Sequence, residues 1–206
     1  MRLFILTIMA SAVILLGVPK AKAFEALDVK ITLPPMEKPD DRPVGYKWVA
    51  MKGSEPYVAT IISKKGDVET WKSTTGCQWS RNAQFAPSLK WSGCSGYDGE
   101  QEVKAPKGKI WPLAVGNTLQ YDYTGFNDNG NSWNGTRKCT VKAQVRVKTV
   151  SGEHDTFKVV CTGGSTTRTR YFSPKLKVSV LYVKDHARRG NTTIEMVRQE
   201  FPGSPK

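Results

Sequence analysis

Histidine is nearly absent from this chain, which has only two in 206 residues, His154 and His186. Both lie in expected turns next to acidic residues, so a histidine-based catalytic centre is poorly supplied. No Gly-x-Ser-x-Gly motif precedes an expected helix, which removes the usual nucleophile elbow of serine hydrolases. The sequence therefore favours a protein without catalytic activity over an enzyme.

Long apolar runs are also missing, apart from one near the start. Arg2 is followed by an apolar run from Leu3 to Val18 and then by Ala21-Lys22-Ala23. This pattern is typical of a signal peptide, residues 1–23, cleaved after Ala23. No later stretch approaches the roughly 20 residues of a spanning helix, and no cysteine for a lipid anchor follows the cleavage site. We expect a soluble exported protein, periplasmic in a Gram-negative cell or otherwise extracellular.

Acidic residues are few relative to basic ones. Three of the 31 Lys and Arg residues lie in the expected signal peptide, so 28 remain against 18 Asp and Glu. A strongly basic exported protein favours anionic partners such as an acidic glycan, a lipid or an envelope protein. We do not expect nucleic acid, because export separates the chain from most of it. The sequence does not predict an oligomeric state.

Cysteine motifs for metal are absent. The chain has no Cys-x-x-Cys pair and no histidine cluster, so we expect no metal and no cofactor. The four cysteines, Cys77, Cys94, Cys139 and Cys161, favour two disulfides in an oxidising compartment. Three pairings are possible. We favour Cys77 with Cys94 and Cys139 with Cys161, because each pair closes a loop of about 20 residues, which stabilises by roughly 3 kcal/mol.

Helical spacing of apolar residues is absent after the signal peptide, whereas short β-rich runs recur between turn residues. We expect an all-β fold, an antiparallel meander that forms a strongly curved sheet or open barrel with a disulfide-stapled loop between Thr74 and Lys107. The expected strands are 46–51, 57–62, 67–71, 118–126, 138–148, 157–161, 166–172, 178–184 and 192–201.

The clearest periodic pattern lies between Lys138 and Lys148. Apolar residues from Cys139 to Val147 alternate with lysine, arginine and other polar residues. This alternation predicts a half-buried strand with one dry and one wet face. A Cys139–Cys161 disulfide would cross to the returning strand if a bulge corrects the register.

The chain divides into segments by composition. Residues 1–23 are the signal peptide, 24–44 a Pro-rich arm or linker, 45–107 a Trp-rich β segment with the Cys77–Cys94 loop, 108–201 an antiparallel segment with Cys139–Cys161, and 202–206 a tail. Residues 45–201 can also form one domain.

Three short motifs carry a resemblance. At Trp111-Pro112-Leu113, at 157–161 and at 168–174, the chain resembles exported bacterial domains of unknown function that form curved antiparallel sheets. The resemblance covers about 110–201. It implies a fold and a compartment and brings no catalytic residues.

Tryptophan is concentrated between residues 48 and 133. The simpler interpretation is that large rings fill the core of a domain with few aliphatic residues. The alternative is a binding platform, in which indoles stack on a sugar or apolar ligand and arginines hold an anionic group. The candidate binding residues are Trp79, Trp91, Trp111, Trp133, Arg146, Arg168 and Arg170.

Three functions remain open from the sequence. The first is a non-catalytic envelope module that binds an anionic glycan, a lipid or a partner protein. The second is a hydrolase of envelope glycans that uses carboxylates among Asp98, Glu100 and Glu102. The third is a secreted inhibitor that presents the Cys77–Cys94 loop.

Overall fold

The computed structural model describes residues 24–27, 29, 31–39, 42–82, 85–94 and 97–203. The predicted signal peptide lies outside these residues. Within them no helix is long and apolar enough to cross a membrane. The described chain forms thirteen strands: β1 (Glu25–Leu27), β2 (Lys47–Lys52), β3 (Glu55–Lys65), β4 (Val68–Ser73), β5 (Gln78–Arg81), β6 (Lys90–Cys94), β7 (Tyr97–Lys109), β8 (Thr118–Asn127), β9 (Ser132–Thr149), β10 (Gly152–Gly163), β11 (Thr166–Ser173), β12 (Val178–His186) and β13 (Gly190–Glu200).

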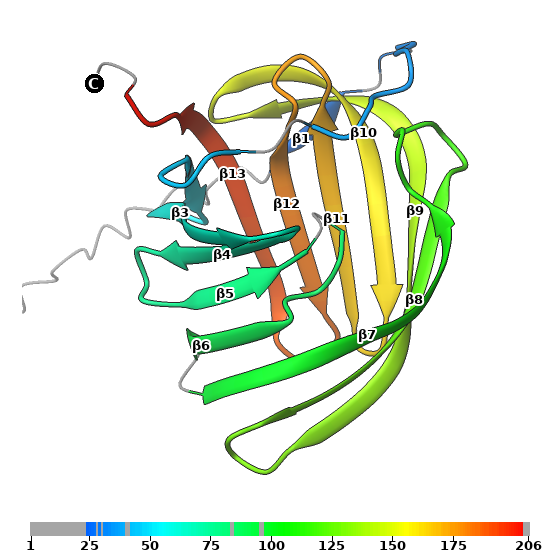
Figure 1. Ribbon diagram of the computed structural model, residues 1–206. Coiled ribbons are helices and arrows are strands. Elements are labelled where there is room, and N and C mark those ends of the chain that lie inside the picture. The colour runs from blue at the N-terminus through cyan, green and yellow to red at the C-terminus, as the bar shows by residue number, and fades with distance from the viewer. Residues whose placement is uncertain are drawn as a thin grey trace, which may run out of the picture.

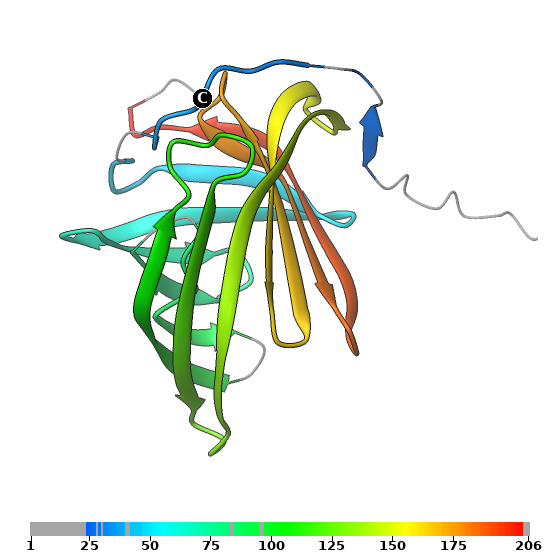
Figure 2. The same ribbon diagram turned by 90° about the vertical axis from the view of Figure 1, so that its right-hand side faces the viewer.

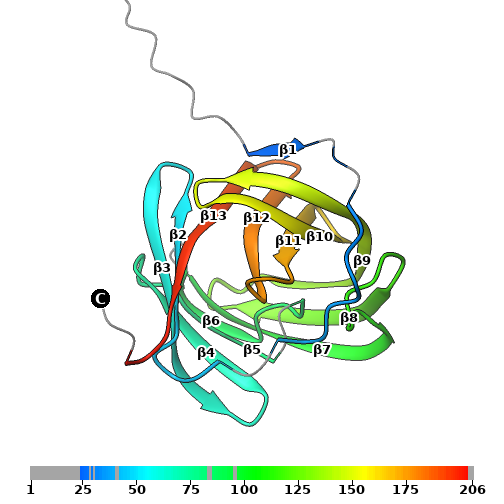
Figure 3. The same cartoon turned by 90° about the horizontal axis from the view of Figure 1, so that it is seen from above.

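The strands form one antiparallel sheet that closes on itself. From β2 to β13 each strand pairs with the next in sequence, β13 pairs back onto β2, and β8 pairs with β9. Twelve strands therefore make a closed barrel, and β1 adds to the far part of β9 outside the ring (Figure 1, Figure 3). The all-β prediction is confirmed. The barrel is closed, whereas the sequence analysis expected a strongly curved sheet or an open barrel.

The segment expected to be an irregular stapled loop is part of the barrel wall. Between Thr74 and Lys107 the chain forms β5, β6 and most of β7. Along β7, Tyr97, Gly99 and Gln101 are half-buried and alternate with exposed acidic residues. Pairing of β5 with β4 and of β7 with β8 holds this segment in the sheet, although its glycines and serines disfavour strand structure locally.

The alternating run on β9 serves two different cores. The register between β9 and β10 shifts at Lys142, because Ala143 pairs with Lys158 whereas Val141 pairs with Val159. Cys139 and Val141 lie in one buried cluster with Phe157, and Val145 and Val147 lie in another with Tyr171. The single dry face that the sequence predicted is therefore divided by this bulge.

The second of these clusters lies where the long β9–β10 hairpin folds over the sheet. Val147 packs with Leu181 and Met196 of β12 and β13. The amide of Val150, at the tip of the hairpin, donates to Glu195 Oε2 at 3.0 Å. Figure 2 shows the hairpin bending away from the straight line of the neighbouring strands.

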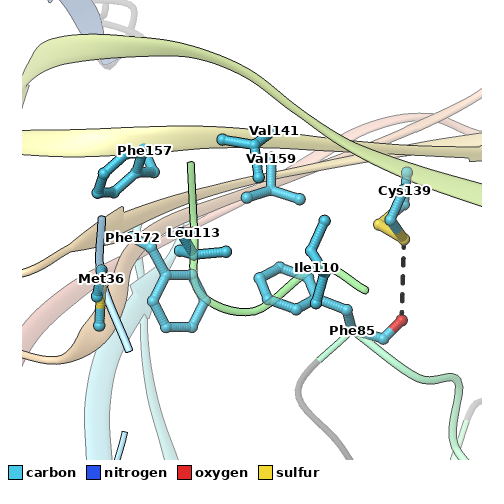
Figure 4. Packing of buried hydrophobic residues seen from close by; sticks show 10 residues of the cluster. Met36, Phe85, Ile110, Leu113, Cys139, Val141, Phe157, Val159 and Phe172 are labelled. Atoms are coloured by element: carbon cyan, nitrogen blue, oxygen red, sulfur yellow. Dashed lines mark hydrogen bonds between the residues drawn. A yellow bond between two sulfur atoms is a disulfide. The ribbon is translucent and has the colours of Figure 1, made fainter. Parts of the chain in front are cut away.

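Buried apolar side chains fill one end of the barrel. Phe85, Leu113, Phe157 and Phe172 pack there, together with the rest of the first cluster (Figure 4). The Cys139–Cys161 disulfide joins β9 to β10 within this cluster, which we call the plug.

The Pro-rich arm lies against the same end of the barrel. Met36 exchanges two backbone hydrogen bonds with Leu113, at 3.1 and 2.7 Å. The Gln144 side chain accepts from the amide of Leu33 and donates to its carbonyl, both at 2.9 Å. Arg42 donates to the Lys177 carbonyl. The arm therefore runs along the rim as a docked segment (Figure 3).

Candidate binding site

The barrel contains two connected chambers beyond the plug. The inner chamber has a volume of about 160 Å³ and reaches Phe85, which also belongs to the plug. The outer chamber has a volume of about 680 Å³ and extends to the β12–β13 turn. The two chambers share the following lining residues: Trp79, Pro87, Ser88, Arg137, Arg168 and Tyr182.

Four arginines line the inner chamber, and strand periodicity explains their placement. Arg168 and Arg170 lie two residues apart on β11, in phase with Phe172 of the plug. Arg137 lies two residues before Cys139 on β9 and shares its face. Arg81 ends β5 on the facing part of the wall, two residues after Trp79, which lines the same chamber. Successive side chains of a strand point to opposite faces, so this phase directs all four into the barrel.

Arg81 is held in a poorly hydrated position. Its side chain is 16% exposed, and its guanidinium lies 4.7 Å from the ring centroid of Trp71. Its Nε has no hydrogen-bond partner and lies 3.8 Å from Glu69 Oε2. Burial and the nearby charge of Arg170 lower the pKa of Arg81 to about 10, against the opposing effect of Glu69. The charge of Arg81 is therefore only weakly compensated.

Arg137 and Arg170 are also short of anionic partners. Arg137 is 6% exposed, its Nε has no hydrogen-bond partner, and its guanidinium lies 5.3 Å from the ring centroid of Tyr123. Arg170 lies 4.6 Å from the ring centroid of Tyr182. Burial lowers the pKa of Arg170. Ring faces attract cations but do not neutralise them.

Indoles form part of the wall of the outer chamber. Trp91 and Trp133 pack together with ring centroids 5.7 Å apart, and Trp133 Nε1 donates to Gln101 Oε1 at 3.1 Å. Trp79 stacks at 6.2 Å on the buried Trp71. These three wall indoles, Trp79, Trp91 and Trp133, remain half-buried and line the chamber. They offer flat apolar surface beside polar groups.

Glycines allow two of the indoles to lie flat against the strands. A Cβ at Gly99 would stand 2.5 Å from Cζ2 of Trp91. A Cβ at Gly125 would stand 2.6 Å from Cε2 of Trp133 and 2.7 Å from the carbonyl oxygen of Glu100. Bare backbone on β7 and β8 therefore makes room for the rings.

Acidic residues are absent from the lining. Within the described part of the chain, no residue that lines either chamber is Asp or Glu. The cationic residues of the outer chamber are Lys52, Arg137, Arg168, Lys184 and Arg189. The carboxylates considered from the sequence, Asp98, Glu100 and Glu102, are exposed on β7 and line neither chamber.

The remaining sequence candidates lie elsewhere. Trp111 packs in the plug, with ring centroids 5.5 Å from Phe85 and 5.6 Å from Phe172. Arg146 makes a bidentate ion pair with Asp155 on β10, at 2.6 and 3.1 Å, far along β9 from the chambers. Of the seven candidates, the structure brings together Trp79, Trp91, Trp133, Arg168 and Arg170.

The cysteines are joined as the sequence favoured. Cys77 is bonded to Cys94, and Cys139 to Cys161. Cys77 and Cys94 line the outer chamber, and Cys161 lines the inner one. The first disulfide therefore lies in the chamber wall instead of at the base of a protruding loop.

Sequence reasoning missed several chamber residues, and one of them had a readable signal. Arg137 precedes the buried Cys139 by two residues on β9. Such phase with a buried residue predicts an inward side chain. Arg81 had no signal, because it lies in the segment interpreted as a loop.

The two histidines lie apart from the arginines of the inner chamber. His186 lines the outer chamber at the β12–β13 turn and accepts from the Arg188 amide at Nδ1. His154 lies beside Ser151 at 3.0 Å on the β9–β10 hairpin. Burial, aided by the charge of Lys175, lowers the pKa of His154.

Comparison with known proteins gives a likeness of fold. No protein-family model matches the chain, and no curated protein matches it in sequence. Among solved structures, the hypothetical lipoprotein YmcC from Escherichia coli K12 is similar, with a TM-score of 0.50 and 9% sequence identity. The likeness covers 80% of this chain and 86% of that one. It agrees, at the level of the fold, with the resemblance to bacterial domains of unknown function.

Proposed function

We propose that this protein is a non-catalytic, exported binding protein that takes part of an acidic glycan into the open end of its barrel. The observation that carries the proposal is a lining of arginines, lysines and half-buried indoles without a carboxylate in the described residues.

The charge of the chambers supports an anionic ligand. Folding places several guanidinium and ammonium groups around one enclosed space, which costs free energy unless counter-charges enter it. Forked guanidinium donors bind oxyanions by paired hydrogen bonds. A ligand that supplies those oxygens would bind with water excluded on most sides.

The wall chemistry favours a sugar over an acyl chain. A lipid tail is best held by a cavity that is apolar throughout, whereas indoles here alternate with tyrosine, glutamine, threonine and basic side chains. Flat aromatic faces next to hydrogen-bonding groups suit a sugar ring, whose faces are apolar and whose edges are polar.

The position of the carboxylates on β7 supports a binding protein over a glycan hydrolase. Glycoside cleavage requires two carboxyl groups facing each other across a substrate. Asp98, Glu100 and Glu102 lie along one exposed face of β7. Glu102 pairs with Lys104 at 2.9 Å. The two disulfides suit an exported protein, because such bonds persist in oxidising compartments.

A binding measurement with the disulfide-intact protein tests the proposal. The ligands are acidic oligosaccharides and neutral ones of equal length, on an array and then by calorimetry. We expect acidic ligands to bind. Trp91→Ala should weaken their binding about tenfold, because it removes one stacking contact worth roughly 1.4 kcal/mol.

The matched control is Phe126→Ala, which removes an aromatic ring that is 55% exposed and lines neither chamber. It should bind like the wild type. Absence of binding by every acidic glycan, or equal binding of neutral ones, would contradict the proposal.

A further inference from the structure

We propose that the inner chamber is a subsite for one compact tetrahedral oxyanion, a phosphate or sulfate group, held by Arg81, Arg137, Arg168 and Arg170. The inference deepens the proposed function, since such a group would be the acidic part of the glycan. It rests on the convergence of these four arginines, which only the inner chamber has together.

Three strands direct the four guanidinium groups into one small space. They come from β5, β9 and β11, and the chamber volume is about 160 Å³. One water needs only about 15 Å³ of such volume, so the space admits a phosphate or sulfate group together with some of its water.

The donors approach from different strands, which favours tetrahedral over planar anions. A carboxylate presents two oxygens in one plane and is satisfied by one or two forked donors. A phosphate or sulfate group presents three or four oxygens in different directions. Four arginines around one chamber match the second arrangement.

Unsatisfied donors indicate that a ligand is needed to complete the site. Nε of Arg81 and Nε of Arg137 are both buried without a hydrogen-bond partner, although buried polar atoms usually have one. The nearest carboxylate, Glu69, accepts a hydrogen bond from Trp71 Nε1 at 3.0 Å and lies outside the chamber lining. Among the described residues, Glu69 is the only carboxylate paired with any of the four arginines, through its 3.8 Å contact with Arg81.

Chemistry at the chamber edge agrees with this assignment. Tyr182 and Ser88 add hydroxyl groups to the lining, and Trp79 bounds it on the side of the outer chamber. A sugar in the outer chamber could therefore stack on the wall indoles while its phosphate or sulfate group reaches the arginines.

The test measures thermal stability and binding with inorganic phosphate and sulfate, at constant ionic strength set with chloride. We expect phosphate and sulfate to raise the melting temperature, and acetate and glucuronate to raise it much less. Binding of glucose 6-phosphate is then compared with binding of glycerol 3-phosphate, which stands for a lipid headgroup. Glucose 6-phosphate should bind more tightly, because only its sugar ring also contacts the indoles.

Two variants remove single arginines and keep the apolar stem, Arg137→Met and Arg168→Met. Each should weaken phosphate binding at least about tenfold. The melting temperature without phosphate should stay the same or rise, because an uncompensated cation is removed. Arg168 is half-buried, so its variant keeps the test usable if the buried Arg137→Met does not fold.

Arg146→Gln is the matched control. Arg146 lies on β9, as Arg137 does, but it pairs with Asp155 outside the chambers. The variant should keep the phosphate effect. The inference fails if phosphate stabilises no more than chloride does, or if Arg168→Met binds phosphate like the wild type.

The two proposals fail separately. If phosphate binds through the arginines but no acidic glycan binds, the subsite stands and the glycan function is wrong. If acidic glycans bind through Trp91 while phosphate and sulfate do not bind, the glycan function stands and the oxyanion subsite is wrong.

Discussion

Gly125 shows how a single missing side chain shapes the outer chamber. The indole of Trp133 lies against its backbone, where a Cβ would approach within 2.6 Å. Gly125→Ala should therefore displace the ring and lower the free energy of unfolding by about 1–3 kcal/mol, with a change in tryptophan emission. Urea titration followed by fluorescence measures both effects.

Thr124→Ala serves as the control for this substitution, because Thr124 is the exposed neighbour on the same strand. Its stability should stay close to that of the wild type. A Gly125→Ala protein with unchanged midpoint and emission would show that the indole has space to spare.

Single residues also explain why the site was only partly predictable. The sequence names Arg168 and Arg170 as guanidinium donors for an anionic group, and the structure places both in one strand phase with Phe172 of the plug. Arg146 is a candidate of the same kind, but Asp155 lies opposite it on β10 and pairs with it. That pairing depends on the register of the two strands. Sequence pattern gives the face of a side chain and not its neighbour across the sheet.

The docked arm is the element whose contribution to stability is easiest to isolate. Met36 is 6% exposed, belongs to the plug and pairs its backbone with Leu113. Met36→Ala should lower the free energy of unfolding by about 2 kcal/mol through lost burial and a residual cavity. Lys38→Ala, an exposed position on the same arm, should change little.

Chemical denaturation of both arm variants measures the difference. Equal stability of Met36→Ala and Lys38→Ala would mean that the arm rests on the rim without contributing to the core. Glycan binding should be unaffected, since Met36 lines neither chamber.

Elements with long regular alternation were predictable, and those held by tertiary pairing were not. The run around Cys139 predicted β9 and its pairing with β10 through a bulge. β5 and β6 have only four and five residues, and glycine and serine surround them. Their strand conformation depends on neighbours that are close in space, which local propensity does not encode. β7 did carry a usable alternation of acidic and inward residues.

At the scale of the whole molecule, the disulfides fix the closed sheet at two places. Replacing Cys77 and Cys94 together by Ala should lower the free energy of unfolding by about 3 kcal/mol through loop entropy. The loops are of similar length, with separations of 17 and 22 residues. Cys139 and Cys161 are also buried in the plug, so their double replacement should cost more.

Urea unfolding of the two double variants, side by side with the wild type, gives the comparison. A smaller loss at Cys139 and Cys161 than at Cys77 and Cys94 would contradict the view that the plug depends on its disulfide.

Because the plug fills one end of the barrel, a ligand that enters at the other end cannot pass through. If the ligand is a polymer, only a terminus can be inserted, and the remaining units must stay outside. The amount of protein that a sample can bind would then follow its number of chain ends instead of its mass. Shearing a long polymer into shorter pieces would increase its capacity to occupy the protein.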